Sequence, residues 1–463
     1  MEVKHEVNGD GYNTEGFFEP VLLRVKGTMV LVGTNGQAER YIVPAVVYSL
    51  FISSTFSITG IEVFTVLVYA LFLVNWLAGR IELGLSKLFV LPFVLFGAIN
   101  ILSVVVNGNF DELTIALKEN YRLLLPICLF PLLQFVNLRR LLLVFSVFIG
   151  LISIYGYFQH LWGVDWLRPE GKGLQEMIQF GGDRVFRAKG NYSVSLTYAG
   201  VLLIVSPVFA ALAWGGFDKK EKKIFGANAI LSLIAIVVSF ARSGWLGVIF
   251  AYSLFVFQLR RRLAITIYVG MIVLFALFLS LHQQGKLKEW FYKPSAPNLV
   301  KRVLMTSLKA DRERLYLWEA GFLAFKDRPL LGYGNPDKSH IEPYREVVSK
   351  RHKNFRFRTS GIQHNVYMQV LYNSGVIGFA AYLFLWWRIL SWNISSLWRA
   401  PEILQRERRL LFGITAGLVG SMLAGSFENN FLDGEVQVVI FMMFAVALRL
   451  GTTFRSQDPK PLL

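Results

Sequence analysis

The sequence predicts an all-α polytopic membrane protein with about 12 transmembrane helices and a mostly helical outer domain between spans 9 and 10. Composition is the first observation. Of the 463 residues 54% are hydrophobic and only 17% are charged, against about 25% charged in ordinary soluble proteins. The second is a succession of apolar runs long enough to cross a bilayer, and the third is the uneven placement of Lys and Arg between them. These observations argue against a multidomain soluble enzyme.

The apolar runs define the spans. A bilayer core of about 30 Å requires about 20 apolar residues in a helix, and twelve runs approach this length. They cover residues 41–58, 61–78, 88–106, 121–136, 141–160, 193–214, 224–240, 244–258, 263–281, 366–388, 410–427 and 435–450. Residues 1–40 are polar, with a small element expected around Val21 to Val32, and lack a basic-then-apolar leader. We therefore expect no cleavable signal peptide.

Basic residues orient the chain. With a cytoplasmic N-terminus, the short inner connections carry 16 Lys and Arg and the short outer ones carry 2. Because short loops rich in Lys and Arg stay in the cytoplasm, this asymmetry predicts an even number of spans. Spans 1 to 9 then occupy residues 41–281, spans 10 to 12 occupy residues 364–450, and residues 451–463 form a cytoplasmic tail. The net charge of +17 favours basic cytoplasmic loops and a site for an anionic substrate over binding of nucleic acid.

Two outer segments are longer than a connection requires, residues 161–192 and residues 282–363. Long ordered loops tend to carry function. Within the second, Leu315, Trp318, Phe322 and Phe325 have the spacing of one apolar helix face. From Leu281 to Gln363 the charge is 17 Lys and Arg against 8 Asp and Glu, which would attract a lipid diphosphate or, equally, anionic head groups.

Several polar residues fall at the outer ends of spans. Arg242 lies between two apolar runs and is either functional or an interfacial arginine that reaches lipid phosphate. His364 begins the return into the membrane, where a lone histidine is more often structural. Arg314, taken alone, reads as an exposed helix charge. Glu428 and Asn429 are candidates for binding acceptor hydroxyls, although a capping or solvated pair is the more common case.

The chain contains four short motifs, which begin at Arg187, Arg242, Arg314 and His364. Arg242 and Leu246 form an Arg-x-x-x-Leu element, and His364-Asn365 precedes two glycines, Gly375 and Gly378. The other two motifs are Arg187-Ala188-Lys189-Gly190 with Tyr198-Ala199-Gly200, and Arg314-Leu315-Tyr316-Leu317-Trp318 followed by Arg328-Pro329-Leu330-Leu331-Gly332-Tyr333-Gly334. Their joint occurrence resembles the bacterial O-antigen ligase and polymerase superfamily over roughly residues 40 to 450.

The resemblance implies a glycosyltransferase of the bacterial inner membrane, acting on the periplasmic face without a metal or cofactor. Its donor would be an undecaprenyl-diphosphate-linked glycan. By resemblance His364 is the general base, Arg242 and Arg314 hold the donor diphosphate, and Arg187 is a further donor-binding candidate. Arg312, two positions from Arg314, is an alternative for the second clamp. Asn365 and Glu428 are expected to contact substrate.

The chemistry of the residues is compatible with this activity. Glycan transfer from a diphosphate requires stabilisation of phosphate charge and deprotonation of the acceptor. The outer face offers no Asp-x-Asp pair and no His/Glu metal cluster, which leaves arginine, whose planar fork binds phosphate oxygens bidentately. Histidine, with an ordinary pKa of about 6.5, suits the base, a role that contributes about 10²–10⁴-fold.

Alternatives remain open at two levels. Within the superfamily the acceptor distinguishes a ligase, which uses lipid A-core, from a polymerase, which extends another lipid-linked repeat, and from a branch that glycosylates proteins. The ligase is preferred because one large loop before the histidine suits it. In a different class, twelve spans also suit a transporter or flippase of lipid-linked sugars. Such proteins place charges near the bilayer midplane, whereas here they gather at one face.

Overall fold

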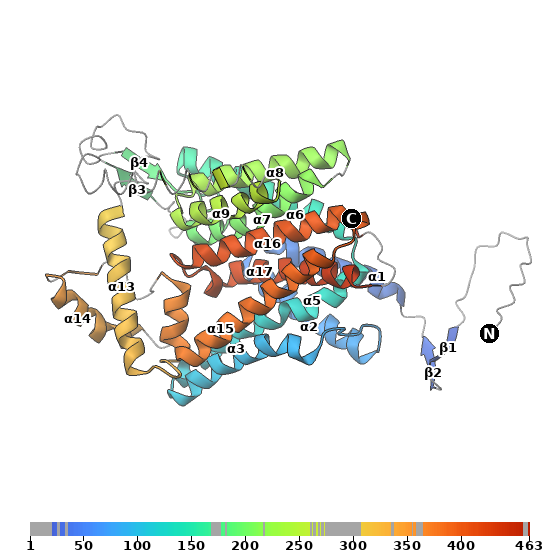
Figure 1. Ribbon diagram of the computed structural model, residues 1–463, viewed down its shortest axis with the longest axis horizontal. Coiled ribbons are helices and arrows are strands. Elements are labelled where there is room, and N and C mark those ends of the chain that lie inside the picture. Colours follow the sequence, from blue (N-terminus) through green and yellow to red (C-terminus); the bar gives the residue numbers. More distant parts are fainter. Residues whose placement is uncertain are drawn as a thin grey trace, which may run out of the picture.

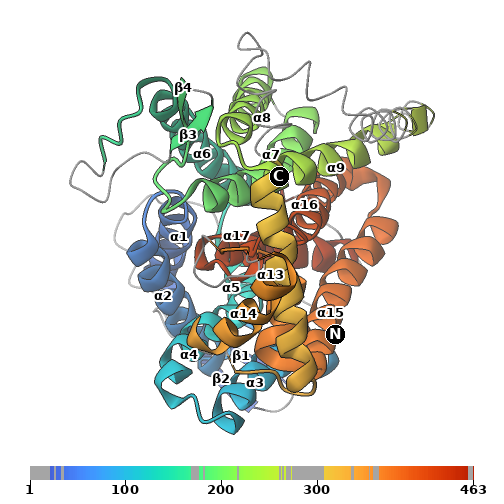
Figure 2. The same cartoon turned by 90° about the vertical axis from the view of Figure 1, so that its left-hand side faces the viewer.

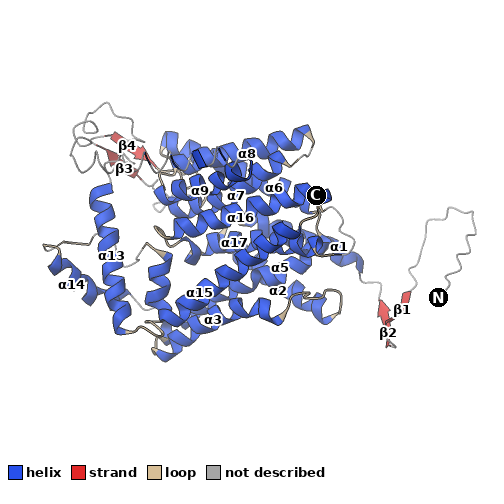
Figure 3. Cartoon of the chain, viewed as in Figure 1, coloured by secondary structure: helices blue, strands red, loops and turns tan. Residues whose placement is uncertain are grey.

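The computed structural model describes residues 21–25, 28–32, 36–167, 177–180, 183–215, 218–259, 307–334, 338–353, 355–357, 364–456 and 462–463, with scattered positions between 262 and 273. The fold is predominantly helical (Figure 3). The α-helices are α1 (Gly36–Ser53), α2 (Ile58–Leu77), α3 (Lys87–Val106), α4 (Leu113–Asn120), α5 (Leu125–Leu132), α6 (Leu138–Trp162), α7 (Ser195–Trp214), α8 (Lys219–Val238), α9 (Arg242–Leu259), α13 (Ser307–Asp327), α14 (Glu342–Arg351), α15 (Val366–Arg399), α16 (Gln405–Gly425) and α17 (Gly434–Phe454).

Short elements complete the described chain. The 3₁₀ turns are η1 (Phe110–Glu112), η2 (Tyr121–Leu124), η3 (Leu133–Phe135), η4 (Lys338–Ile341), η5 (Glu402–Leu404) and η6 (Asn430–Leu432). Two antiparallel hairpins are formed by β1 (Val21–Val25) with β2 (Thr28–Val32), and by β3 (Met177–Phe180) with β4 (Asp183–Phe186). The first hairpin is the small N-terminal element that the sequence predicts.

The long helices run side by side in one bundle, with the C-terminal residues at the end opposite α13 (Figure 1). Six described helices, α2, α3, α6, α7, α15 and α17, are long and apolar enough to cross a membrane. Helices α7 and α17 lie at the centre, with 83% of their apolar windows buried, whereas α2 has 22% buried. The helical membrane protein is therefore confirmed. The count of twelve stays a prediction, and most of the ninth predicted span, residues 263–281, lies outside the described residues.

Glycines allow three helices to pack closely. A Cβ at Gly417 on α16 would lie 2.3 Å from the Ile204 carbonyl oxygen of α7. A Cβ at Gly420 would lie 2.6 Å from the Gly247 carbonyl oxygen of α9. Small residues at such crossings let backbones approach in a membrane, where packing rather than the hydrophobic effect drives association. Helix α9, which begins at Arg242, is thereby held against α16.

Helix α13 lies across one end of the bundle, nearly perpendicular to the other helices, with α14 outside it (Figures 1 and 2). The predicted helix is present, but its buried face differs from the apolar spacing in the sequence. Leu317, Ala320 and Ala324 are buried, whereas Leu315 is 55% and Phe322 42% exposed. The reason is that α13 packs its small residues onto a cluster that contains Tyr333, Ile341, Val348 and Tyr372, which leaves the larger apolar side chains on the opposite face.

The glycine motif after α13 is a backbone junction with α15. Gly375 interrupts α15 with φ 63° and ψ −165°, and the Val376 and Ile377 N–H groups donate to the Pro329 and Leu330 carbonyls at 2.8 and 3.2 Å. A Cβ at Gly375 would lie 2.3 Å from the Leu330 oxygen. Only glycine meets both the left-handed φ and this approach.

Two further glycines complete this junction. Gly332 and Gly334 also have positive φ, and the Gly334 N–H donates to the Asn373 carbonyl at 2.7 Å. The Asn107 side chain of α3 donates to the Gly332 carbonyl at 3.0 Å. The junction therefore fixes the C-terminal end of α13 to α3 and α15.

Candidate active site

A cavity of about 260 Å³ lies where α13 crosses the ends of α9 and α16. Its lining residues are Arg242, Ser243, Leu246, Arg314, Leu315, Trp318 and Phe427. Arg242 and Leu246 are four residues apart on α9, and Arg314 and Trp318 are four apart on α13. Residues at this spacing share one helix face. Each of the two arginine motifs thus presents one guanidinium and one apolar side chain to the same cavity.

Arg242 owes its place to the turn between α8 and α9. Phe240 has φ 54°, which reverses the chain sharply so that α9 begins at Arg242. The N-terminal turn of α9 therefore lies at the cavity, where the positive end of the helix dipole favours an anion. Phe240 packs with Val185 and Trp245, which holds the turn against the strand β4.

A carboxylate joins the two other predicted site residues. Glu428 accepts a hydrogen bond from Arg314 Nη2, and its second oxygen lies 3.3 Å from His364 Nδ1. Arg314 Nη1 also donates to the Phe427 carbonyl at 3.0 Å. The Glu428 side chain is only 3% exposed, so it is a buried, doubly paired group rather than a solvated one. Glu428 therefore fixes the cation and the imidazole relative to each other.

The backbone directs the His364 ring toward Glu428. His364 has φ 47°, a left-handed conformation that is uncommon outside glycine and costs energy. Next to it, Asn365 Oδ1 caps α15 by accepting from the Tyr367 and Met368 N–H groups, and Asn365 Nδ2 donates to the Ser426 carbonyl at 2.9 Å. An ionised carboxylate only accepts hydrogen bonds, which assigns the proton to Nδ1 and leaves Nε2 as an acceptor.

Arg187, the further donor-binding candidate, contacts the turn between α8 and α9. Its Nε donates to the Ser239 carbonyl at 2.9 Å, at the end of α8. Arg187 is absent from the described lining of the cavity. The adjoining Lys189 forms a buried ion pair with Asp165 at 3.0 Å, so the segment after β4 is fixed to the end of α6. A donor contact by Arg187 stays a prediction, and the side chain of Arg312 lies outside the described residues.

This geometry suits a lipid-linked anion. Two guanidinium groups and a helix N-terminus supply positive charge, while Leu246, Leu315 and Trp318 supply apolar surface. Arginine binds phosphate oxygens through its planar fork. His364, whose Nδ1 contacts Glu428, has Nε2 available to accept a proton. The cluster can therefore stabilise phosphate charge and remove a proton from a hydroxyl at neighbouring positions.

Comparison with known proteins gives a match over one segment of the chain. Residues 227–383 match the family model described as O-antigen ligase. This match covers residues 227–383 of the 463. It supports the resemblance to the O-antigen ligase and polymerase superfamily that the motifs indicate. The matched segment includes Arg242, Arg314 and His364, whereas Glu428 lies beyond it.

A second comparison extends over part of the chain. A segment of 178 residues is 27% identical to an uncharacterised protein of Haemophilus influenzae, and it covers 36% of this chain and 43% of that protein. The similarity thus spans less than half the length of that relative. It assigns no activity to either protein.

Two features of the site could not be found from local sequence. Glu428 is 64 residues from His364 and 114 from Arg314, so no spacing rule connects them. Phe427 was not singled out because one aromatic residue at a span end is common. The sequence does contain one signal, the four-residue spacing within each arginine motif. This spacing predicts that Arg242 and Leu246 share a face of one helix and that Arg314 and Trp318 share a face of another. It does not predict that the two faces meet.

Proposed function

We propose that this protein is an O-antigen ligase family glycosyltransferase that moves a glycan from undecaprenyl diphosphate to an acceptor hydroxyl. The acceptor in this proposal is lipid A-core, and the reaction occurs at the periplasmic face of the bacterial inner membrane. The observation that carries the proposal is the single cavity lined by both arginine motifs, with Arg314 connected to His364 through Glu428.

In the proposed reaction His364 Nε2 accepts the proton of the acceptor hydroxyl. The acceptor oxygen then forms a bond to the anomeric carbon of the donor sugar, and the bond from that carbon to the diphosphate oxygen breaks. Arg242 and Arg314 bind the diphosphate as its negative charge increases, which is typically the largest contribution to catalysis in such a site. Glu428 keeps His364 in the tautomer that can accept the proton and stabilises the imidazolium that forms.

The cavity's apolar wall supports a lipid-linked donor. Leu315 and Leu246 are 55% and 47% exposed, and both border the two guanidinium groups. An isoprenoid chain can pack against this surface while its diphosphate contacts the arginines. We assign no metal to the reaction, because arginine and the helix N-terminus provide positive charge at the proposed phosphate position.

A polymerase of the same superfamily would use the same cavity. The two activities differ in the acceptor, and the cavity described here belongs to the donor side. A transporter of lipid-linked sugars is the alternative from another class. The grouping of Arg242, Arg314 and His364 at one end of the bundle favours surface chemistry over passage through it, because transport sites generally lie near the midplane.

The test is transfer in vitro with purified full-length protein. The donor is a purified undecaprenyl-diphosphate glycan, and separate reactions contain lipid A-core or a second lipid-linked repeat, each with EDTA. A single transfer to lipid A-core supports the ligase, whereas elongation of the lipid-linked repeat supports the polymerase. Movement of donor across vesicles without any transfer would contradict the enzyme, and a requirement for divalent cation would contradict the arginine mechanism.

A further inference from the structure

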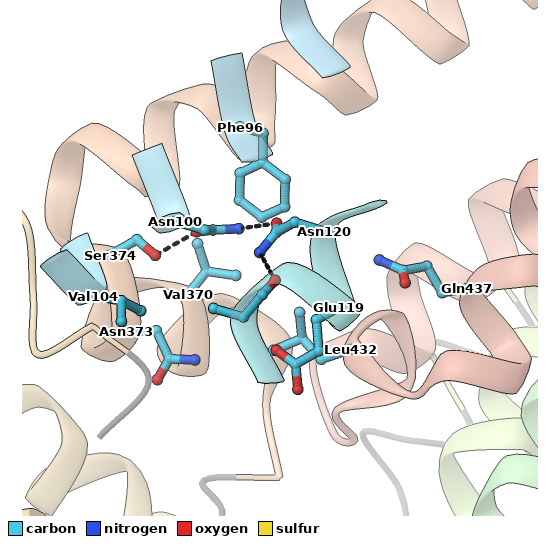
Figure 4. Close-up of a pocket in the computed structure, with 11 residues that line it drawn as sticks. Phe96, Asn100, Val104, Glu119, Asn120, Val370, Asn373, Ser374, Leu432 and Gln437 are labelled. Atoms are coloured by element: carbon cyan, nitrogen blue, oxygen red, sulfur yellow. Dashed lines mark hydrogen bonds between the residues drawn. The ribbon is translucent and has the colours of Figure 1, made fainter. Parts of the chain in front are cut away.

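A second pocket, whose described lining holds no basic residue, takes no part in the site described above. It has a volume of about 30 Å³ between α3, α4, α15 and α17. Its polar lining residues are Asn100, Glu119, Asn120, Asn373, Ser374 and Gln437 (Figure 4). Lys, Arg and His are absent from this described lining. The pocket thus presents amides, a hydroxyl and one carboxyl, which are the groups that hydrogen-bond neutral polar ligands.

Part of this lining is pre-ordered. Asn100 Nδ2 donates to Asn120 Oδ1 at 2.8 Å, and Ser374 Oγ donates to Asn100 Oδ1. Asn120 Nδ2 donates to the Ala116 carbonyl at 2.7 Å. These bonds connect α3, α4 and α15 and hold the amides in fixed orientations (Figure 4). Binding of a ligand to these amides would therefore cost little conformational entropy in the protein side chains.

Gln437 provides an independent observation. Its residue is only 3% exposed, and its amide is directed at the pocket (Figure 4). Among the described residues, no hydrogen bond is made by this side-chain amide. Leaving a buried amide unpaired costs about 1–3 kcal/mol, so buried polar groups are almost always satisfied by protein, water or a ligand. Gln437 therefore calls for a hydrogen-bonding occupant of the pocket.

Glu119 makes the pocket unsuitable for an anion. It lies in the connection between α3 and α5, and burial raises its pKa to about 7, with Arg122 opposing and Glu112 adding to the rise. Near neutral pH the carboxyl is therefore partly protonated and can donate or accept a hydrogen bond. When ionised it repels phosphate. The diphosphate and this pocket are chemically incompatible, whereas sugar hydroxyl and acetamido groups match every lining residue named above.

The position of the pocket relates it to the proposed base. Asn373 lies seven residues into α15 from Val366, about 10 Å along the axis, and His364 directly precedes the N-cap of this helix. The cavity with the two arginines lies against α9 and α13, whereas this second pocket lies against α3, α4, α15 and α17. The two sites are therefore separate, and in an inverting displacement the leaving diphosphate and the acceptor oxygen lie on opposite faces of the donor sugar.

We propose that this pocket binds an uncharged pendant group of the acceptor sugar, such as a hydroxymethyl or acetamido group. The inference rests on the proposed glycosyltransferase function. The volume admits about two or three water-sized groups, so it accommodates one substituent rather than a whole ring. The sugar ring itself would extend from the pocket along α15 toward His364.

Binding can be measured without relying on transfer activity. The protein is the full-length chain in detergent, the probes are N-acetylglucosamine and glucose, and the readout is saturation-transfer NMR. The variants are Gln437→Met, which removes the amide without unpairing any described partner, and Glu119→Leu. The matched control is Gln405→Met, the same change at the opposite end of α16 from the site.

We expect saturation transfer to at least one sugar in the wild type and in Gln405→Met, and loss of that signal in Gln437→Met and Glu119→Leu. In the transfer assay, Gln437→Met should raise the KM for the acceptor roughly 2- to 12-fold, the effect of one neutral hydrogen bond, and leave the KM for the donor unchanged. An equal signal in wild type and Gln437→Met, or no signal for either sugar in the wild type, overturns the subsite. Absence of transfer by the wild type contradicts the enzyme function instead, because the binding result is independent of it.

Discussion

Replacing Glu428 by glutamine tests whether the carboxylate controls His364. The substitution keeps the size of the side chain and one oxygen, which can still accept from Arg314. The other oxygen of Glu428, which lies 3.3 Å from His364 Nδ1 in the wild type, is replaced by an amide nitrogen that only donates. Two donors cannot face each other, so the imidazole must place its proton on Nε2, where it can no longer accept one from the acceptor hydroxyl.

The size of the effect has two parts. A hydrogen bond to a charged group contributes about 1.5–3 kcal/mol, which corresponds to roughly 10- to 150-fold in rate when it is lost from the transition state. Loss of the correct tautomer removes general base catalysis, about 10²–10⁴-fold. We therefore expect kcat to fall by about 10²-fold or more, with a smaller change in the KM for the donor.

The chain contains a matched control. Glu319 accepts from Arg351 Nη1 at 3.1 Å and lies 2.7 Å from His352 Nε2, so it is another carboxylate shared by an arginine and a histidine. Its side chain is 31% exposed and lies outside the cavity. Glu319→Gln should leave kcat within about twofold of wild type. A change of less than threefold in Glu428→Gln, or equal losses in both variants, would refute the role of Glu428.

Further outcomes are expected at four residues. His364→Ala should abolish transfer, and Arg242→Lys should be nearly as damaging because lysine lacks the bidentate fork of arginine. Immunoblots of membranes should show that both variants insert as the wild type does. Full activity of either variant would exclude that residue from the mechanism. Gly375→Ala should lower Tm, because the left-handed backbone costs about 1–3 kcal/mol before any clash with Leu330, whereas Gly226→Ala, whose nearest neighbour would be 3.8 Å away, should not. The raised pKa of Glu119, about 7 against an ordinary 4.5, means that its neutral form stabilises the fold and that this contribution is lost as pH rises through 7. Thermal denaturation should accordingly show the wild type losing Tm relative to Glu119→Gln between about pH 5 and pH 8, and parallel curves would contradict this.

Helices and their apolar character were predictable from local sequence. Apolar length alone identified helices such as α7 and α17, which pack at the centre, because twenty apolar residues can satisfy their backbone only as a helix in lipid. The face of α13 was not predictable in the same way. Leu315 and Trp318 have the spacing of a buried face but line a cavity, and the alanines opposite them are buried by a partner segment that local periodicity cannot identify.

The site was predictable as a set of residues and not as an arrangement. Arg242, Arg314 and His364 were identified by short motifs, since each motif is local. The connection of Arg314 to His364 through Glu428 depends on how α13 and α15 meet the end of α16, which is a property of the tertiary fold. The second pocket, which Asn100 and Gln437 line, was not predictable from the sequence. Each of these residues is a single polar residue within an apolar helix.

The glycine motifs explain how the site keeps its geometry. Helix α13 is held at two points, through Arg314 to Glu428 near its N-terminal end and through the Gly332 and Gly334 junction beyond its C-terminal end. Helix α15 meets the same two points, because His364 precedes its first residue and Gly375 lies at its interruption. Two helices joined at two points form a closed frame, so the distance from the Arg314 guanidinium to the His364 imidazole depends on the glycine junction as well as on Glu428. A substitution at Gly375 that still folds should therefore reduce kcat even though Gly375 is absent from the described lining of the cavity.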